Sequence, residues 1–302
     1  MKGDRLLFKS GFIGIIGRPN VGKSTLLNAL VGEKIAITAS KPQTTRNRIM
    51  GIRNQPEGQM IFMDTPGLHK ADSPLNRQMV NIARDTFQRV EVLLLLVDAT
   101  AGVHKADRFI IQSLPEGAMP VILAISKIDL VKKTQLLPLI DELHPLRPFA
   151  AIVPLSARTG DGLPQLVHEI LQALPEGPVY FPEDTMTDAS ERFIAAEIVR
   201  EKIILLTRQE IPYATAVVVD AFKEDEQKQL IRIQATIHVE KDSQKGILIG
   251  KKGVKLKEIG TKARLDMEQF FNTRIYLELF VRVQKDWTHD EKMLKQFGYF
   301  QK

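Results

Sequence analysis

The chain has 302 residues, of which 44% are hydrophobic and 26% charged, a composition typical of a soluble protein of about two domains. It contains no cysteine, which excludes disulfides, thiolate catalysis and a cysteine-bound metal, and it has no apolar run of the ~18 residues that a membrane span needs. The N-terminus shows no signal peptide, so a cytoplasmic protein is expected, and the formal net charge of +6 favours an anionic partner.

Strand-sized apolar runs recur through the first half of the chain. Two of them, at 91–98 and 120–125, show no polar/apolar alternation, which is typical of strands buried on both faces of a parallel sheet. A turn at 54–58 predicts a hairpin between the runs at 48–53 and 59–63. The predicted strands cover 11–16, 34–37, 48–53, 59–63, 91–98, 120–125 and 151–155, and a helix is predicted at 25–31.

The first motif stands between the first predicted strand and this helix, at residues 17–24. Its sequence, GRPNVGKS, fits the phosphate-binding P-loop pattern G-x-x-x-x-G-K-[ST]. Gly17 and Gly22 allow backbone N–H groups to converge on phosphate oxygens at a helix N-terminus. Lys23 can reach the β- and γ-phosphates, and the Ser24 hydroxyl can ligate Mg²⁺. The predicted nucleotide-binding residues here are Gly17, Arg18, Pro19, Asn20, Val21, Gly22, Lys23, Ser24 and Thr25.

Two later loops carry residues suited to sensing a γ-phosphate. Thr45 follows Thr44 in a loop after the P-loop helix, where its hydroxyl can contact the γ-phosphate through Mg²⁺; a simple polar turn accounts for this pair equally well. Asp64 ends a predicted strand, so its carboxylate can hold Mg²⁺ through water, and the Gly67 N–H can turn toward the γ-phosphate. The candidate residues of this second loop are Asp64, Thr65, Pro66 and Gly67.

The ends of the last two predicted strands suggest a guanine site. Asp129 can accept hydrogen bonds from both N1–H and the 2-amino group of guanine, a pair that adenine lacks. Backbone N–H groups after the strand at 151–155 can meet the guanine O6. Ligands of open α/β sheets bind at such carboxyl strand ends. The candidate base-binding residues are Ser126, Lys127, Ile128, Asp129, Ser156 and Ala157.

These five motifs, in this order, resemble those of the translation-factor-like GTPases. The resemblance implies an α/β P-loop GTPase domain, with a mixed, mostly parallel sheet and helices on both faces, that binds GTP and GDP and hydrolyses GTP slowly with Mg²⁺. The residues that it implies for Mg²⁺ are Ser24, Thr45 and Asp64, and those that it implies for catalysis are Lys23, Thr45, Gly67 and Asn20.

Two positions depart from the family pattern. Ser126 stands where these GTPases usually have an asparagine that ties the base to the P-loop, which affects nucleotide affinity more than guanine selection. Leu68 stands where Ras-like proteins place a water-orienting glutamine, and leucine cannot orient water. Relatives with asparagine at the position of Asn20 hold K⁺ near the β/γ-phosphate bridge, so the resemblance implies K⁺ there.

A second domain is predicted after a proline-containing stretch without periodicity. We expect the GTPase domain at 1–178, a semi-rigid linker at 179–188, an RNA-binding domain at 189–285 and a helical tail at 286–302, with Trp287 in that tail serving as a packing residue. The predicted elements of the second domain are a helix from 188–190, strands at 213–221 and 229–239, a helix ending near 271 and a strand at 274–283.

The order of these elements, with G-x-x-G at 250–253 opening a helix, resembles a smaller α+β KH domain of the bacterial (type II) arrangement. In that fold the glycine loop clamps about four single-stranded nucleotides. Residues 245–264 contain seven Lys or Arg against one acid, Glu258, although a solvated basic helix face would show the same charges. An apolar floor for the bases is predicted from Ile247, Leu248, Ile249 and Val254. The predicted RNA-binding residues are Ile249, Gly250, Lys251, Lys252, Gly253, Lys255 and Lys257.

Taken over nearly its whole length, the chain resembles the Era family of bacterial GTPases. That resemblance implies binding to the single-stranded 3′ end of 16S rRNA, a nucleotide-timed role in assembly of the 30S ribosomal subunit, and peripheral association with the inner face of the cell membrane. One alternative is a constitutive RNA-binding assembly factor whose nucleotide site is structural, which Leu68 and Ser126 would suit. Another, a P-loop ATPase or small-molecule kinase, conflicts with Asp129.

Overall fold

The computed structural model describes residues 7–39, 41, 44–67, 73–87, 89–115, 117 and 119–299. Contacts divide the chain into two compact units, each with its own hydrophobic core. The N-terminal unit ends at Asp188 and the C-terminal unit begins at Ala189. The C-terminal unit also includes the described residues of 37–44 and 71–78, two short segments of the first half of the sequence.

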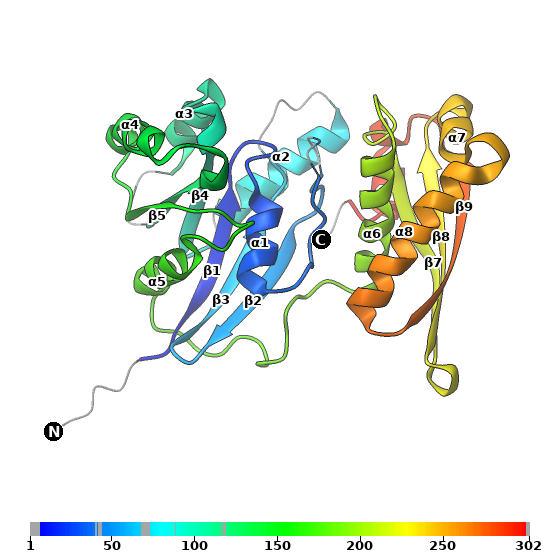
Figure 1. Cartoon of the computed structure of the whole chain (residues 1–302), viewed down its shortest axis with the longest axis horizontal. Helices are drawn as coiled ribbons and strands as arrows, with labels where there is room; N and C mark the ends of the chain where they lie inside the picture. Colours follow the sequence, from blue (N-terminus) through cyan, green and yellow to red (C-terminus); the bar gives the residue numbers. More distant parts are fainter. Residues whose placement is uncertain are drawn as a thin grey trace. The chain divides into compact units, whose positions relative to one another are not determined.

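A six-stranded sheet forms the centre of the N-terminal unit (Figure 1). Its strand order is β2-β3-β1-β4-β5-β6, and every neighbouring pair is parallel except β2–β3. The carboxyl ends of the five parallel strands therefore meet at one edge, where the predicted nucleotide motifs begin. The strands are β1 (Lys9–Ile16), β2 (Ile49–Gln55), β3 (Gly58–Asp64), β4 (Val92–Asp98), β5 (Val121–Ser126) and β6 (Ala151–Pro154).

Helices cover both faces of this sheet, as predicted (Figure 1). Odd-numbered residues of β4 and β5 pack with α3 and α4, and even-numbered residues point to the opposite face because side chains alternate along a strand. Both rows are buried, which explains why these strands lack polar/apolar alternation. The helices are α1 (Lys23–Val31), α2 (Pro74–Phe87), α3 (Lys105–Ser113), α4 (Leu136–Leu143) and α5 (Leu163–Ala173).

The strand predicted at 34–37 is wrong, because this apolar segment is irregular. Ile35, Ala36 and Ile37 are buried, as the apolar run suggested. The Asn28 side chain hydrogen-bonds both backbone groups of Ala36: its Oδ1 accepts from the N–H at 2.9 Å and its Nδ2 donates to the carbonyl at 2.7 Å. A side chain of α1 thus satisfies backbone groups that a neighbouring strand would otherwise satisfy.

The C-terminal unit is built on a three-stranded sheet, β7-β8-β9, in which β7–β8 is antiparallel and β8–β9 parallel. Helices α6 and α8 pack on this sheet around a core that includes Ile198, Ile233 and Ile259. The elements are α6 (Glu191–Leu206), β7 (Ala216–Asp225), β8 (Leu230–Val239), α7 (Asp242–Ile249), α8 (Val254–Phe271), β9 (Arg274–Val283) and α9 (Glu291–Gln296).

Two predictions for this unit were wrong in detail. The first strand begins at Ala216 rather than at Tyr213, because the N–H groups of Tyr213 and Ala214 both donate to the Glu210 carbonyl in a turn. Residues 242–249, for which no helix or strand was predicted, form the additional helix α7.

The predicted linker 179–188 is held along the N-terminal unit. The Gln59 side chain accepts from the N–H groups of Tyr180 and Phe181 at 2.8 and 3.0 Å, and the Ile52 N–H donates to the Met186 carbonyl at 2.8 Å. Hydrogen bonds to β2 and β3, and not only its prolines, therefore order this segment.

The tail contains the buried indole of Trp287, whose Nε1 donates to the Ala214 carbonyl at 3.0 Å. This contact confirms the packing role predicted for Trp287. No helix in the described part of the chain is both long and apolar enough to cross a membrane.

Candidate functional site

The P-loop connects the end of β1 to the start of α1. A Cβ added at Gly17 would lie 2.7 Å from the Leu96 carbonyl oxygen, so the loop can follow β4 closely only without a side chain at this position. The buried Lys23 Nζ donates to the carbonyls of Gly17 and Arg18, each at 3.2 Å. Burial lowers the pKa of Lys23 to about 8, although the nearby carboxylate of Asp64 opposes this change.

Three predicted metal ligands converge beside Lys23. The Ser24 hydroxyl donates to Asp64 Oδ2 at 2.6 Å and lies 2.7 Å from the Thr45 hydroxyl, which is 3.3 Å from the same carboxylate oxygen. Asp64 is fully buried, and burial raises its pKa despite the charge of Lys23 and these hydrogen bonds. Its other oxygen, Oδ1, has no hydrogen-bond partner among the described residues. Three hard oxygen donors with an unsatisfied carboxylate oxygen fit Mg²⁺.

The segment after Asp64 lies directly against the P-loop. The Thr65 hydroxyl donates to the Ile15 carbonyl at 3.0 Å, and a Cβ added at Gly67 would lie 2.9 Å from the Pro19 nitrogen. Glycine is therefore required at position 67 for this approach. Leu68, the position of the missing glutamine, lies outside the described residues.

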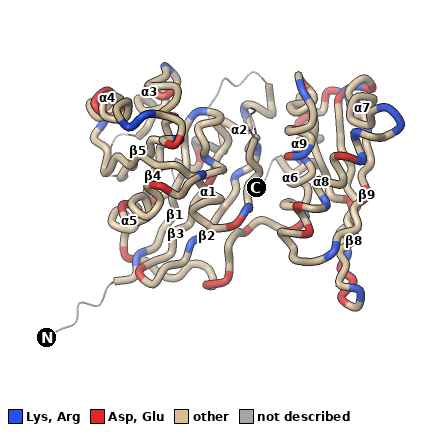
Figure 2. Tube along the Cα trace, viewed as in Figure 1, with Lys and Arg blue, Asp and Glu red and all other residues tan. Residues whose placement is uncertain are grey.

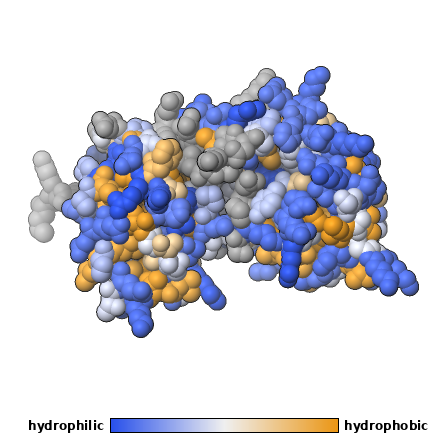
Figure 3. Space-filling view, turned by 90° about the horizontal axis from the view of Figure 1, so that it is seen from above, coloured by the Kyte–Doolittle hydropathy of each residue, from blue (hydrophilic) through white to orange (hydrophobic). Residues whose placement is uncertain are grey.

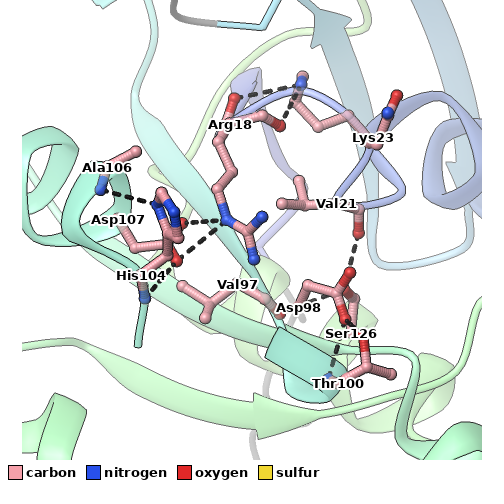
Figure 4. A network of polar contacts seen from close by, with 12 residues as sticks. Arg18, Val21, Lys23, Val97, Asp98, Thr100, His104, Ala106, Asp107 and Ser126 are labelled. Atoms are coloured by element: carbon pink, nitrogen blue, oxygen red, sulfur yellow. Dashed lines mark hydrogen bonds and ion pairs between the residues drawn. The ribbon is translucent and has the colours of Figure 1, made fainter. Parts of the chain in front are cut away.

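A polar network anchors the first variable residue of the P-loop to α3 (Figure 4). The Arg18 Nε donates to both carboxylate oxygens of Asp107 at 3.0 and 3.1 Å, and Asp107 is 1% exposed. Asp107 also accepts from the His104 N–H at 3.1 Å, and His104 Nδ1 in turn accepts from the Ala106 N–H, so the helix start and the loop share one carboxylate. Burial raises the pKa of Asp107, while the charge of Arg18 opposes the rise.

Ser126 supplies a direct link between the base-side strand and the P-loop (Figure 4). Its hydroxyl donates to the Val21 carbonyl at 2.7 Å and lies 3.1 Å from the Val97 carbonyl. A serine therefore makes the connection to the P-loop that the sequence left in question. This hydroxyl is buried, so no water competes for the bond.

Lys127 provides a second link to the same loop. It has a left-handed backbone conformation, and its Nζ donates to the Asn20 carbonyl at 2.8 Å and to Asp98 Oδ2 at 2.6 Å. Burial acts to raise the pKa of Asp98, but hydrogen bonds from Lys127 and Thr100 outweigh it and lower the pKa. Asp129 is exposed in the following short 3₁₀ helix (Ile128–Leu130), where its carboxylate is accessible to a ligand.

The loop after β6 contains two predicted donors to the guanine O6, the backbone N–H groups of Ser156 and Ala157. The Ser156 N–H donates to the Asp161 carbonyl at 2.9 Å, and the Ser156 hydroxyl accepts from the Thr159 N–H. Because the Ser156 N–H is engaged in this turn, Ala157 is the better candidate to meet a guanine O6. The remaining candidates, Pro66, Ile128 and the exposed Thr25, lie within the loop and helix segments predicted for them.

Sequence reasoning missed Asp98 and Asp107. Asp98 ends an apolar strand, as Asp64 does. Its position at the carboxyl edge of the sheet could therefore have identified it as a candidate site residue. Asp107 lies in the first turn of α3, where an acid ordinarily serves helix capping, and only the folded chain brings it to Arg18.

A tight turn at 250–253 carries the second predicted site. Gly250, Lys252 and Gly253 all have positive φ, at 71°, 53° and 77°, and a Cβ at Gly250 would lie 2.8 Å from that of Lys255. The turn therefore requires glycine at position 250 and presents Lys251 and Lys252 to solvent at the start of α8. Figure 2 shows these basic residues as a blue loop beside α7.

A groove of about 380 Å³ runs from this turn between α8 and β9. The exposed Lys257 lies along it, whereas Lys255 and Lys262 form ion pairs with Glu258 at 3.0 and 3.1 Å. Apolar surface is interspersed with hydrophilic surface on this half of the chain (Figure 3). The groove is lined by Gly253, Leu256, Lys257, Gly260, Thr261, Arg264, Leu277 and Leu279.

Of the apolar floor predicted from Ile247, Leu248, Ile249 and Val254, the structure contradicts Leu248. Because 242–249 is helical, consecutive residues point in different directions: Leu248 is fully buried in the core, whereas Ile247 is 55% exposed. The groove itself is lined by the apolar residues Leu256 on α8 and Leu277 and Leu279 on β9.

Both halves of the chain match known families. The model of the 50S ribosome-binding GTPase family matches residues 12–127, and that of the KH domain matches residues 210–288. GTPase Era of Syntrophus aciditrophicus (strain SB) is 64% identical over 297 residues, covering 98% of this chain and 97% of that protein. GTPase Era of Geobacter metallireducens is 56% identical over 292 residues, covering 97% and 98%.

Two solved structures are similar over nearly the whole chain. One is a variant of Aquifex aeolicus Era bound to GDP·AlF₄⁻, and the other is Era in complex with MgGDPNP and nucleotides 1506–1542 of 16S ribosomal RNA. Each has a TM-score of 0.93 and 43% sequence identity, covering 97% of this chain and 100% of the solved chain. These matches confirm the predicted fold class, a P-loop GTPase domain followed by a KH domain.

Proposed function

The chain belongs to the Era family of GTPases and hydrolyses GTP; from this premise we propose that it binds the single-stranded 3′ end of 16S rRNA and acts as a nucleotide-timed factor in assembly of the 30S subunit. The observation that carries the proposal is the presence, in one chain, of a P-loop oxygen cluster and a basic groove next to a G-x-x-G turn. The related Era structure that contains both MgGDPNP and 16S rRNA supports it. Family membership also suggests a cytoplasmic location with peripheral association with the inner face of the cell membrane.

In this proposal, Ser24, Thr45 and Asp64 hold Mg²⁺. When bound, Mg²⁺ neutralises charge on the β- and γ-phosphates. The Lys23 ammonium, which donates to two P-loop carbonyls, exchanges those bonds for phosphate oxygens and thereby gains a stronger, charge-assisted partner. Asp129 reads the guanine base, and Ser126 and Lys127 keep the base loop fixed to the P-loop.

Hydrolysis without a water-orienting glutamine requires other groups. In this proposal the N–H of Gly67, whose backbone lies close to Pro19 of the P-loop, turns toward the γ-phosphate. Asn20 is exposed in the P-loop, and its amide oxygen is a hard donor that fits K⁺. We propose K⁺ at this position, next to the phosphates.

On the RNA side, the Gly250–Gly253 turn and the N-terminus of α8 hold the sugar-phosphate chain, and Lys251, Lys252 and Lys257 supply positive charge. Bases then lie in the groove against Leu277 and Leu279.

The described residues of 37–44, which directly precede Thr45 in the sequence, can make RNA binding depend on the nucleotide. Within the C-terminal unit, the Thr38 N–H donates to Glu201 at 3.0 Å, Arg200 donates to the Thr44 carbonyl, and Lys41 donates to two carbonyls at the end of α6. The next residue, Thr45, belongs to the oxygen cluster at Asp64. Loss of the γ-phosphate at Thr45 would therefore disturb contacts on α6, which packs against α8 of the RNA-binding half.

GTP hydrolysis with and without an oligonucleotide of the 16S rRNA 3′ end, in K⁺ buffer, tests the proposal. We expect stimulation by the oligonucleotide, and loss of that stimulation when Gly250 and Gly253 are both changed to Asp. A matched control, Lys228→Glu on the β7–β8 hairpin, introduces an acid away from the groove and should retain stimulation.

Absence of RNA binding by the native chain would refute the RNA-binding function. RNA binding without stimulation, and with equal affinity in the GTP-analogue and GDP states, would instead favour the constitutive binder. Replacing K⁺ by Na⁺ in the same assay checks the cation at Asn20, since an unchanged rate would exclude a role for K⁺.

A further inference from the structure

Gly260 is an unusual residue for its place in the fold. It lies inside α8, an 18-residue helix, seven residues after Gly253, and its backbone φ is not in the left-handed range. Glycine in a helix interior is less favourable than alanine because it loses more backbone freedom on folding. The conformation at this position therefore gives no reason for glycine.

Packing within the protein gives no reason either. A Cβ built at Gly260 meets one side-chain atom of the described residues, Leu279 Cδ1, at 3.4 Å, which is an ordinary contact with a flexible side chain. Gly250, by contrast, needs both its positive φ and the absence of a Cβ, which would lie 2.8 Å from the Cβ of Lys255. The fold would accept alanine at 260 but not at 250.

The surroundings of Gly260 point to a ligand. The fully buried residues Ile259, Ala263 and Met267 form the face of α8 that packs on the core. Gly260 follows Ile259 in the sequence and therefore lies beside this face, not on it. It lines the groove, between the flanking Lys257 and the half-buried Leu279. At Gly260 the surface of α8 thus carries no side chain, on the side of the helix that faces Leu277 and Leu279 of β9.

We infer that Gly260 is the point at which one base of the bound single strand rests on the α8 backbone, so that the missing side chain serves the ligand and not the fold. The inference rests on the proposed RNA-binding function and adds to it a residue that positions one nucleotide. A planar nucleobase can pack between the bare helix surface and Leu279, and a methyl group at 260 would push it out of the groove.

The test compares Gly260→Ala with Gly246→Ala, a matched change in α7 at an exposed glycine outside the groove lining, where a Cβ meets nothing within 4 Å. The ligand is the 16S rRNA 3′-end oligonucleotide, used intact and as a series with one abasic nucleotide per molecule. Both variants should raise the urea midpoint of unfolding. Gly260→Ala should also weaken binding of the intact oligonucleotide by about tenfold, because one base loses its contact with the helix, while Gly246→Ala should not.

The abasic series identifies the nucleotide. At one position, removal of the base should eliminate the difference between native chain and Gly260→Ala, because both changes remove the same contact. Equal affinity of the two chains for the intact oligonucleotide would overturn the inference while leaving RNA binding in place. If the native chain does not bind the oligonucleotide at all, the proposed function fails first, so the two failures are distinguishable.

Discussion

Arg18 and Asp107 form an ion pair that joins the P-loop to α3, with the Arg18 Nε 3.0 and 3.1 Å from the two carboxylate oxygens. The arginine side chain is 18% exposed and the aspartate 1%. Removing one partner of such a pair leaves the other charge poorly solvated, which costs more than the pair itself contributes. The pair therefore holds the loop in place more strongly than an exposed pair could.

Asp107→Ala should lower the free energy of unfolding by about 1–3 kcal/mol and weaken GTP binding by about fivefold, because the P-loop loses its anchor on α3. Chemical denaturation and nucleotide titration measure the two effects. Glu142→Ala, which removes the exposed partner of the Arg108 pair, is the control and should change stability by less than about 1 kcal/mol. Unchanged GTP affinity in Asp107→Ala would show that the anchor does not shape the phosphate site.

Ser126→Ala should weaken binding of GTP and GDP alike by about 0.5–1.5 kcal/mol, the contribution of one hydrogen bond, because the Val21 carbonyl loses its buried donor. The preference for guanine over adenine should remain, since Ser126 does not face the base edge in this proposal. Competition titrations with GTP, GDP and ATP measure both. Ser113→Ala, which removes a comparable bond to the Ile110 carbonyl, should leave nucleotide binding unaltered.

Asp129→Asn should move the base preference from guanine toward xanthine by about 5- to 150-fold, the range that 1–3 kcal/mol of paired hydrogen bonds allows. An amide cannot accept both guanine N–H groups, whereas its NH₂ can donate to the 2-carbonyl of xanthine. Competition between GTP and XTP measures the change. Retained preference for GTP would place the base-reading acid elsewhere in the chain.

Lys41→Ala should reduce the dependence of RNA affinity on the bound nucleotide, because it removes the bonds from this segment to the Ile204 and Thr207 carbonyls. A coupling of about 1–3 kcal/mol is typical, so the affinity ratio between the GTP-analogue and GDP states should fall toward one. Lys228→Ala, on the β7–β8 hairpin, is the charge-matched control. If the ratio is the same in both variants, the Lys41 contacts do not transmit the nucleotide state.

His238→Gln should flatten the pH dependence of stability on the acidic side. Burial lowers the pKa of His238 from 6.5, and Arg282 adds to this effect while Asp220 opposes it; the ring also lies 4.4 Å from that of Phe297. As pH falls below 6.5, His238 therefore takes up a proton in the unfolded chain before it does so in the folded chain. The free energy of unfolding that is present above this pH consequently decreases in acid.

Thermal unfolding between about pH 7.5 and 5.5 measures this change, since the charge of His238 is titrated there. His289→Gln, at an exposed tail position, is the control. A native-like slope in His238→Gln would mean that other groups dominate acid destabilisation.

The amino-acid sequence by itself determined the motifs that consist of a few consecutive residues, and the helix, strand end or turn in which each lies. The P-loop between a strand and a helix, Asp64 at the end of a strand, Asp129 shortly after one, and G-x-x-G before a helix were all placed correctly in the secondary structure. Each depends on backbone turns, strand ends or helix starts that a few consecutive residues encode. The buried parallel strands were equally visible, because a strand covered on both faces needs apolar side chains at every position and so shows no alternation.

Only the tertiary structure decided which distant groups meet. Asp107 reaches Arg18 across 89 residues, and Ser126 reaches Val21 across 105, distances in sequence over which no local pattern operates. The apolar segments at 34–37 and 247–249 were misjudged for the same reason. The Asn28 side chain satisfies the backbone groups that a strand partner would have satisfied, and the helix at 242–249 buries Leu248 in the core. Local patterns specify which conformations a segment favours, but partners from elsewhere in the fold select the one that forms.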